Sequence, residues 1–124
     1  MAKKILIVDD SVTMTLSLKS GLELNGFIIE TASDGMLALN KLKAGFKPDL
    51  IITDINMPNM DGLELIRQIK VQAHLKFTPI LTLTTEGDPS KREIGKKLGA
   101  TGWLIKPISG LDLLKVIKQV LPGS

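Results

Sequence analysis

Five short aliphatic segments alternate with segments of helical periodicity, and this alternation limits the possible folds more than any other feature of the sequence. We predict strands at residues 4–8, 27–31, 50–53, 79–83 and 102–105. The first, third and fourth are apolar almost throughout, as is typical of strands covered on both faces. Such alternation predicts a parallel sheet with helices on both sides. Because five units are too few to close a barrel, we expect an open, doubly wound (βα)5 fold of the α/β class.

The ends of the intervening helices are marked by capping residues. Asp61 followed three residues later by Glu64 predicts a capping box at the start of the third helix. Asp88 directly before Pro89 predicts an N-cap and a first helical residue for the fourth helix. Gly99 suits the end of that helix. The strands and helices therefore fill most of the chain, with short loops between them.

The composition excludes several kinds of site. The sequence has no cysteine and one histidine, which argues against disulfides and against zinc or copper centres. Any metal would therefore be a hard ion held by oxygen. The net charge of +3 is small and only four residues are aromatic (three Phe and one Trp), so we expect no nucleic-acid binding.

The length of the chain sets an expectation for its organisation. Its 124 residues suffice for one hydrophobic core, so we predict a single domain over residues 1–124. Only Pro122, Gly123 and Ser124 follow the last predicted helix, and we expect no output domain. No apolar run reaches the roughly 20 residues that span a bilayer. We therefore expect a cytoplasmic protein that does not bind membranes.

Polar residues follow the ends of four predicted strands: Asp9 and Asp10, Asp54, Thr84, and Lys106. If the strand order is flavodoxin-like, the first and third strands are neighbours and the three aspartates converge. Three carboxylates repel one another unless a cation is bound, and Mg²⁺ suits such a set. Lys106 and the Thr84 hydroxyl then supply a cation and a donor for an arriving anion, which indicates phosphoryl transfer. Taken singly, each aspartate is as well explained by a turn or a helix cap, and a lone lysine by solvent exposure.

In these strand-end residues and the motifs around them, the sequence resembles the receiver domain of bacterial two-component response regulators, and most closely the single-domain chemotaxis type. The resemblance extends from about residue 3 to residue 121. The matching motifs are Val8-Asp9-Asp10-Ser11, the block Asp54-Ile55-Asn56-Met57-Pro58-Asn59-Met60-Asp61-Gly62, Thr84, and Lys106-Pro107. The resemblance implies a flavodoxin-like sheet with strand order 2-1-3-4-5.

The resemblance also implies roles for the strand-end residues. Asp54 is expected to be the phosphoacceptor, which attacks a phosphohistidine on a sensor histidine kinase. Asp10 and Asp54 would hold Mg²⁺ directly, together with the backbone carbonyl of Asn56, and Asp9 would act largely through water. Lys106 would pair with the phosphoryl oxygens. The Lys-Pro peptide bond after the fifth strand is expected to be cis.

Four positions are expected to govern switching and signal lifetime. By resemblance, Thr84 is the switch hydroxyl, and Asn56 and Glu86 tune the rate of dephosphorylation as in fast-cycling chemotaxis receivers. Trp103 stands where the family usually has tyrosine or phenylalanine. Because overfilling a packed site costs about 1–3 kcal/mol, we predict that its rotamer is not strictly tied to phosphorylation. The alternative is a partly exposed Trp103 that anchors a partner.

The expected partners are proteins. The resemblance implies a chemotaxis-type kinase, a phosphatase, and an output protein that docks on the face formed by helix 4, strand 5 and helix 5. The basic side chains of the fourth predicted helix favour an acidic partner there: Lys91, Arg92, Lys96 and Lys97. Solvated surface charge is the simpler explanation of this run.

Three alternative functions differ in their use of the acidic residues. A phosphorelay receiver would pass its phosphoryl group to a histidine phosphotransfer protein, and a scaffold would bind partners without phosphorylation. A Mg²⁺-dependent phosphatase with an aspartyl nucleophile usually carries a second aspartate two residues later as its general acid. Asn56 occupies that position and cannot transfer the proton. We therefore expect no enzymatic activity beyond self-catalysed phosphorylation and dephosphorylation.

Overall fold

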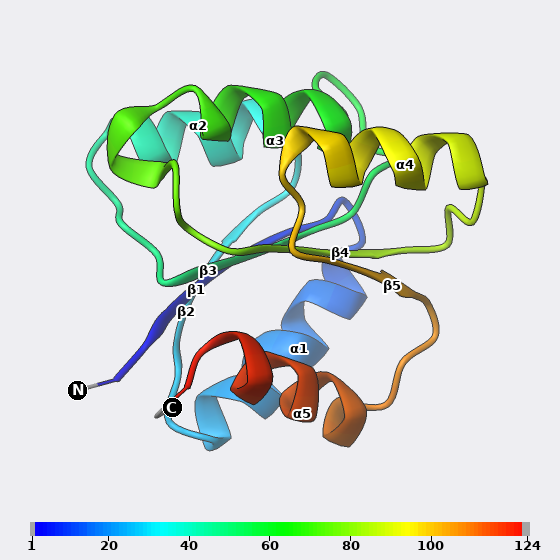
Figure 1. Cartoon of the computed structure of the whole chain (residues 1–124). Helices are drawn as coiled ribbons and strands as arrows, with labels where there is room; N and C mark the ends of the chain where they lie inside the picture. The colour runs from blue at the N-terminus through cyan, green and yellow to red at the C-terminus, as the bar shows by residue number, and fades with distance from the viewer. Residues whose placement is uncertain (1, 123–124) are drawn as a thin grey trace.

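The computed structural model describes residues 2–122, and strands and helices alternate along them as predicted (Figure 1). The strands are β1 (Lys4–Val8), β2 (Ile28–Ala32), β3 (Leu50–Thr53), β4 (Ile80–Thr84) and β5 (Gly102–Ile105). The helices are α1 (Val12–Leu24), α2 (Gly35–Lys43), α3 (Gly62–Lys70), the 3-10 turn η1 (Ala73–Leu75), α4 (Pro89–Leu98) and α5 (Gly110–Val120). Residues 1 and 123–124, which the predicted domain includes, lie outside the described residues.

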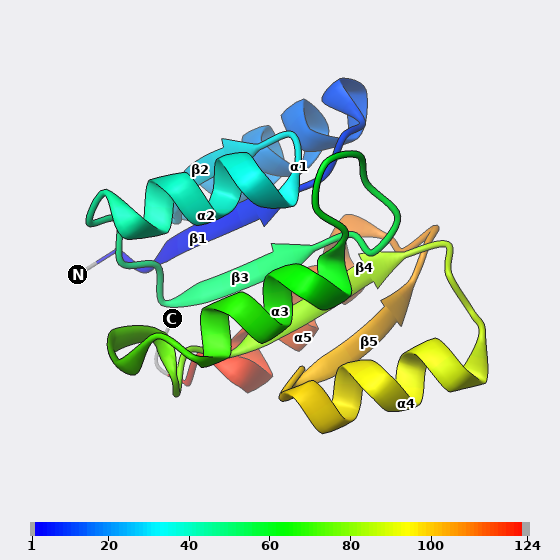
Figure 2. The same ribbon diagram turned by 90° about the horizontal axis from the view of Figure 1, so that it is seen from above.

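The sheet is parallel throughout and its strand order is β2-β1-β3-β4-β5, which confirms the predicted fold. Helices α1 and α5 cover one face, and α2, α3 and α4 cover the other (Figures 1 and 2). The order reverses between β1 and β3, where Val8 is paired with Thr53. The residues that follow this pair, Asp9 and Asp54, therefore leave the sheet side by side.

Each face of the sheet has its own hydrophobic core. Leu6 and Ile51 pack with residues of α2 and α3, including the fully buried Ile66. Ile7 and Ile52 alternate with them along the strands and pack against α1 and α5. Burial on both faces explains why β1, β3 and β4 are apolar over most of their length.

The structure corrects some predicted boundaries by one residue. β2 and β4 each begin and end one residue later than predicted, so Thr84 is the last residue of β4 and is fully buried. Asp61 caps α3 by accepting a hydrogen bond from the Glu64 N–H at 2.9 Å. The Glu64 carboxylate accepts instead from Arg67 and Gln68, so the predicted capping box is only half formed.

The predicted ends of α4 are confirmed. Asp88 accepts a hydrogen bond from the Ser90 N–H at 2.9 Å, Pro89 is the first helical residue, and Gly99 ends the helix with a φ of 113°. Between residues 2 and 122, none of the helices has both the length and the apolar character needed to cross a membrane.

Candidate functional site

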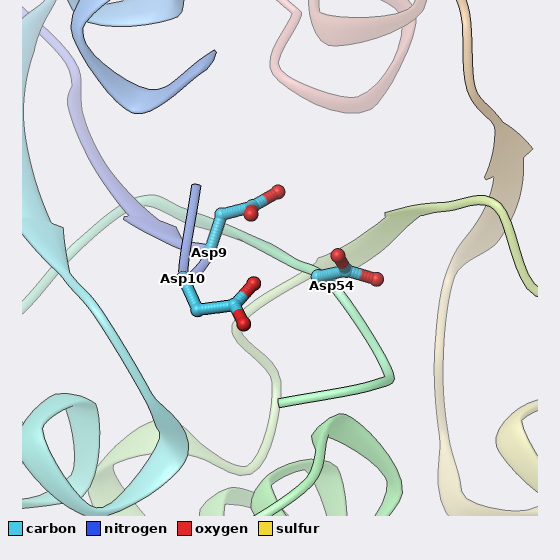
Figure 3. A group of neighbouring side chains, drawn as sticks. All are labelled: Asp9, Asp10 and Asp54. Atoms are coloured by element: carbon cyan, nitrogen blue, oxygen red, sulfur yellow. The ribbon is translucent and has the colours of Figure 1, made fainter. Parts of the chain in front are cut away.

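Three carboxylates meet at the carboxyl end of the sheet, where β1 and β3 lie side by side. One carboxylate oxygen from each of Asp9, Asp10 and Asp54 lies within 4.8 Å of the other two, and the three side chains are drawn in Figure 3. Asp9 and Asp54 are buried, whereas Asp10 is exposed. The predicted convergence of the three aspartates is therefore present, and the strand order produces it.

Lys106 brings a positive charge into this cluster from the end of β5. Its Nζ donates hydrogen bonds to Asp9 Oδ2 at 2.8 Å and to Asp54 Oδ2 at 2.9 Å. Burial by itself would lower the pKa of the Lys106 ammonium, but the hydrogen bonds and charges of Asp9 and Asp54 outweigh it and raise the pKa above its usual value. Lys106 is therefore a permanent cation at neutral pH. The Lys106–Pro107 peptide bond is cis, as expected.

Backbone N–H groups fix the second oxygen of each buried carboxylate. Ser11 donates to Asp9 Oδ1 at 2.9 Å, and Ile55 donates to Asp54 Oδ1 at 2.6 Å. Ser11, rather than Asp10, caps α1. Within the described residues, no hydrogen bond or ion pair engages the Asp10 carboxylate, so one acidic group of the cluster is free to bind a cation.

This donor set fits a hard divalent cation. Carboxylate oxygens are the ligands that Mg²⁺ prefers, and Mg²⁺ needs only one or two of them because it keeps several waters. A single lysine leaves the three acidic groups of the cluster with an excess of negative charge. Asp10 and Asp54 are suitably placed as direct ligands. The ligand role of the Asn56 carbonyl stays a prediction.

Glu86 connects the two predicted switch residues through its backbone. Its N–H donates to the Thr84 hydroxyl at 3.1 Å, and its carbonyl accepts a hydrogen bond from the Trp103 indole Nε1 at 2.9 Å. The Thr84 hydroxyl is therefore bonded to the loop after β4 and not to a carboxylate of the acidic cluster. The Trp103 ring is half-buried and packs against α4 at Gly95, where a Cβ atom would lie 2.8 Å from the ring carbon Cζ3.

The Glu86 side chain accepts hydrogen bonds from α4, from the loop after β3 and from its own loop. Its Oε1 accepts from Lys91 Nζ at 3.0 Å and from Asn56 Nδ2 at 3.4 Å, and its Oε2 accepts from the Asp88 N–H at 3.2 Å. The Lys91 hydrogen bond, followed by those from Asp88 and Asn56, lowers the pKa of Glu86 below the usual glutamate value. The two residues predicted to tune dephosphorylation thus lie in contact, beside but outside the acidic cluster.

Close packing fixes the loop that follows Asp54. The Gly62 N–H donates to the Ile55 carbonyl at 2.8 Å, and a Cβ at position 62 would lie 2.1 Å from the Asp54 carbonyl oxygen. Only glycine allows this approach. Asp34, next to α2, holds the same loop by accepting a hydrogen bond from Asn59, and neither residue was predicted from the sequence to have this role. The signal that could have found Asp34 is its place before Gly35, where it caps α2.

The fold and the site together define a parallel α/β domain with an acidic site, in contact with one lysine, at its topological switch point. The model of the response regulator receiver domain family matches residues 5–118. The chain belongs to that family.

Two curated relatives are transcriptional regulators. The alkaline phosphatase synthesis transcriptional regulatory protein PhoP of Bacillus subtilis is 40% identical over 124 residues, which cover all of this chain and 50% of that protein. The CpxR homolog of Haemophilus influenzae is 37% identical and is covered to 51%. The chain therefore spans about half the length of these curated relatives.

A solved structure of similar length is that of a chemotaxis protein. The chemotaxis response regulator CheY4 of Vibrio cholerae is 45% identical to this chain with a TM-score of 0.91. The match covers 98% of this chain and 100% of CheY4.

Proposed function

We propose that this receiver domain accepts a phosphoryl group on the Asp54 carboxylate from a phosphohistidine of a sensor histidine kinase. One observation carries the proposal: Asp9, Asp10, Asp54 and the Lys106 ammonium converge at one point of the sheet edge. An Asp54 oxygen forms a bond to phosphorus while the bond from phosphorus to the histidine nitrogen breaks. The imidazole leaves with the electron pair of that bond.

The chain's own groups stabilise this transfer. The Lys106 ammonium, which lies 2.9 Å from Asp54 Oδ2, pairs with the charge on the phosphoryl oxygens. Asp10, Asp54 and the Asn56 carbonyl would hold Mg²⁺, with Asp9 acting largely through water, and the ion would supply further positive charge at the phosphoryl oxygens. Thr84 acts as the switch hydroxyl. Asn56 and Glu86, in contact at 3.4 Å, tune the approach of the water that ends the signal.

We further propose chemotaxis signalling in the cytoplasm, with switching of protein contacts as the output. The support is the match to CheY4 over the full length of that protein. The kinase would be of the chemotaxis type, a phosphatase would shorten the signal, and the output protein would dock on the face of α4, β5 and α5. The transcriptional regulators among the relatives keep other pathways open, including a phosphorelay. We expect no catalytic turnover of other phosphoesters, and hydrolysis of para-nitrophenyl phosphate would contradict this.

The test uses beryllium fluoride, which mimics a phosphoryl group on a carboxylate. The protein is titrated with this compound in the presence of Mg²⁺, and Trp103 fluorescence and backbone amide shifts are recorded, with Asp54→Asn as the control. A saturable, Mg²⁺-dependent change that the control lacks supports phosphorylation at Asp54. Absence of any change in the wild-type protein would favour a scaffold that acts without phosphorylation.

A further inference from the structure

Residues 56–61, in the loop between β3 and α3, are fastened to the start of α2 by a side-chain hydrogen bond. Asn59 Nδ2 donates to Asp34 Oδ2 at 2.7 Å. Next to it, the Gly35 N–H donates to the Met60 carbonyl at 3.2 Å. These bonds connect the loop that carries Asn56 with an element that has no residue in the acidic cluster.

Asp34 is built into this position as a buried anion. Only 6% of its surface is exposed, and its other oxygen, Oδ1, caps α2 by accepting from the Leu37 N–H at 2.9 Å. The hydrogen bond from Leu37, followed by that from Asn59, lowers the pKa of Asp34 below the usual aspartate value. Asp34 therefore remains an ionised acceptor, which makes its hydrogen bond to Asn59 charge-assisted and stronger than a neutral one.

The backbone conformation of Asn59 indicates that its side chain is needed for the hydrogen bond to Asp34. Its φ is 67°, and among residues 2–122 it is the one non-glycine residue with a positive φ. Glycine adopts this conformation more easily than any other residue. Since the backbone alone would favour glycine, the feature that asparagine adds is the amide that reaches Asp34.

The attachment on the α2 side is the firmer of the two side-chain attachments of this loop. On the opposite side, Asn56 Nδ2 reaches Glu86 Oε1 at 3.4 Å, and Asn56 is exposed. The segment that carries Asp34 is also bonded to the acidic cluster, because the Asp9 N–H donates to the Ala32 carbonyl at 3.0 Å. The segment that carries Asp34 is thus connected to Asp9 through Ala32 and to the β3–α3 loop through Asn59.

We propose that Asp34 is a positioning residue, which through Asn59 sets the β3–α3 loop, and with it the backbone of Asn56, for cation binding beside Asp54. This inference rests on the proposed function, because it assumes that the acidic cluster binds Mg²⁺. Groups that orient metal ligands without touching the metal change metal affinity by about 10- to 100-fold when they are removed. Asp34 acts through a second residue, so we expect the lower end of that range.

The test breaks the same hydrogen bond from each side with the full chain. Asp34→Ser removes the acceptor of Asn59 but keeps an N-cap for α2, since serine caps helices as well as aspartate does. Asn59→Gly removes the donor and suits the positive φ. Asp88→Ser is the matched control, because it makes the same exchange at the N-cap of α4. Each variant is titrated with Mg²⁺ while its backbone amide chemical shifts are recorded. Hydrogen exchange of the Gly35 amide is measured in the metal-free protein.

We expect both variants to weaken Mg²⁺ binding by about tenfold and to speed exchange at Gly35, with no change for Asp88→Ser. The double variant should be no weaker than either single variant, because both remove one interaction. Wild-type affinity in both single variants, or additive losses in the double variant, would overturn the role of Asp34. Failure of the wild-type protein to bind Mg²⁺ would instead overturn the proposed function.

Discussion

The Trp103 indole donates a hydrogen bond to the Glu86 carbonyl, and the N–H of the same Glu86 donates to the Thr84 hydroxyl. One peptide segment thus joins the predicted switch hydroxyl to the aromatic residue on the neighbouring strand. A movement of Thr84 acts on the segment that holds the indole. This arrangement favours a tie between the two residues, in contrast to the loosely coupled Trp103 predicted from its size.

The first prediction concerns this connection. Thr84→Val keeps the volume of the side chain but removes the acceptor of the Glu86 N–H, so we expect Trp103 emission to shift to longer wavelength. Trp103 is the sole tryptophan and the chain has no tyrosine, so the emission reports on one ring. Thr84→Ser keeps the hydroxyl and should emit like the wild type. Identical spectra for all three proteins would mean that Trp103 is held independently of Thr84.

The second prediction separates two effects of the Lys106 charge: it opposes the binding of Mg²⁺, and it pairs with a bound phosphoryl group. Lys106→Met removes a cation that lies 2.8 Å from Asp9 and 2.9 Å from Asp54. Unit charges about 4 Å apart interact by about 4 kcal/mol at the effective dielectric of a partly exposed site, so Mg²⁺ affinity should rise by tenfold or more. Beryllium fluoride binding should be lost, because its fluorine atoms lose their partner. Calorimetric titration measures both affinities, with Lys97→Met on α4 as the control.

The third prediction follows the charge of Glu86. Because its pKa is lowered, the Glu86 carboxylate stays ionised to a lower pH than an ordinary glutamate. The stabilisation by Lys91 is therefore complete at neutral pH and is lost only as the pH falls through the lowered pKa. Lys91→Gln removes the largest cause of the shift and should move the midpoint of the Glu86 titration upward. Carboxyl NMR shifts give the midpoint, and Lys96→Gln on the same helix should leave it unchanged.

The fourth prediction compares two glycines by the space around them. A Cβ at Gly62 would lie 2.1 Å from the Asp54 carbonyl oxygen, whereas a Cβ at Gly21 in α1 has no atom within 4 Å. Gly62→Ala should therefore destabilise the fold by about 2 kcal/mol or more, since backbone must move. Gly21→Ala should stabilise it by about 0.5–1 kcal/mol through helix propensity. Urea unfolding gives both values, and equal effects would contradict the packing at Gly62.

The alternation of strands and helices and the acidic residues at the strand ends could be predicted because both depend on local patterns, whereas the strand order was implied by the resemblance to receiver domains. Strand ends are marked by the change from apolar to acidic residues at Asp9 and Asp54, and the strand order then brings them together. The links through Glu86 could not be predicted in the same way, because they use backbone groups that every residue possesses. Asn59 was missed because neither its positive φ nor its distance from Asp34 leaves a periodic signal.

The contact between Gly95 and the Trp103 ring links the changes that the two positions can undergo over evolutionary time. While the indole keeps this position, even a methyl group at position 95 would lie 2.8 Å from its Cζ3 atom, so a larger residue there requires the ring or α4 to move. A smaller aromatic residue at position 103 removes that requirement, and α4 is then free to replace its glycine with a better helix former. If position 95 then carried a larger side chain, a tryptophan restored at position 103 would meet it, so the residues that fit at positions 95 and 103 depend on each other.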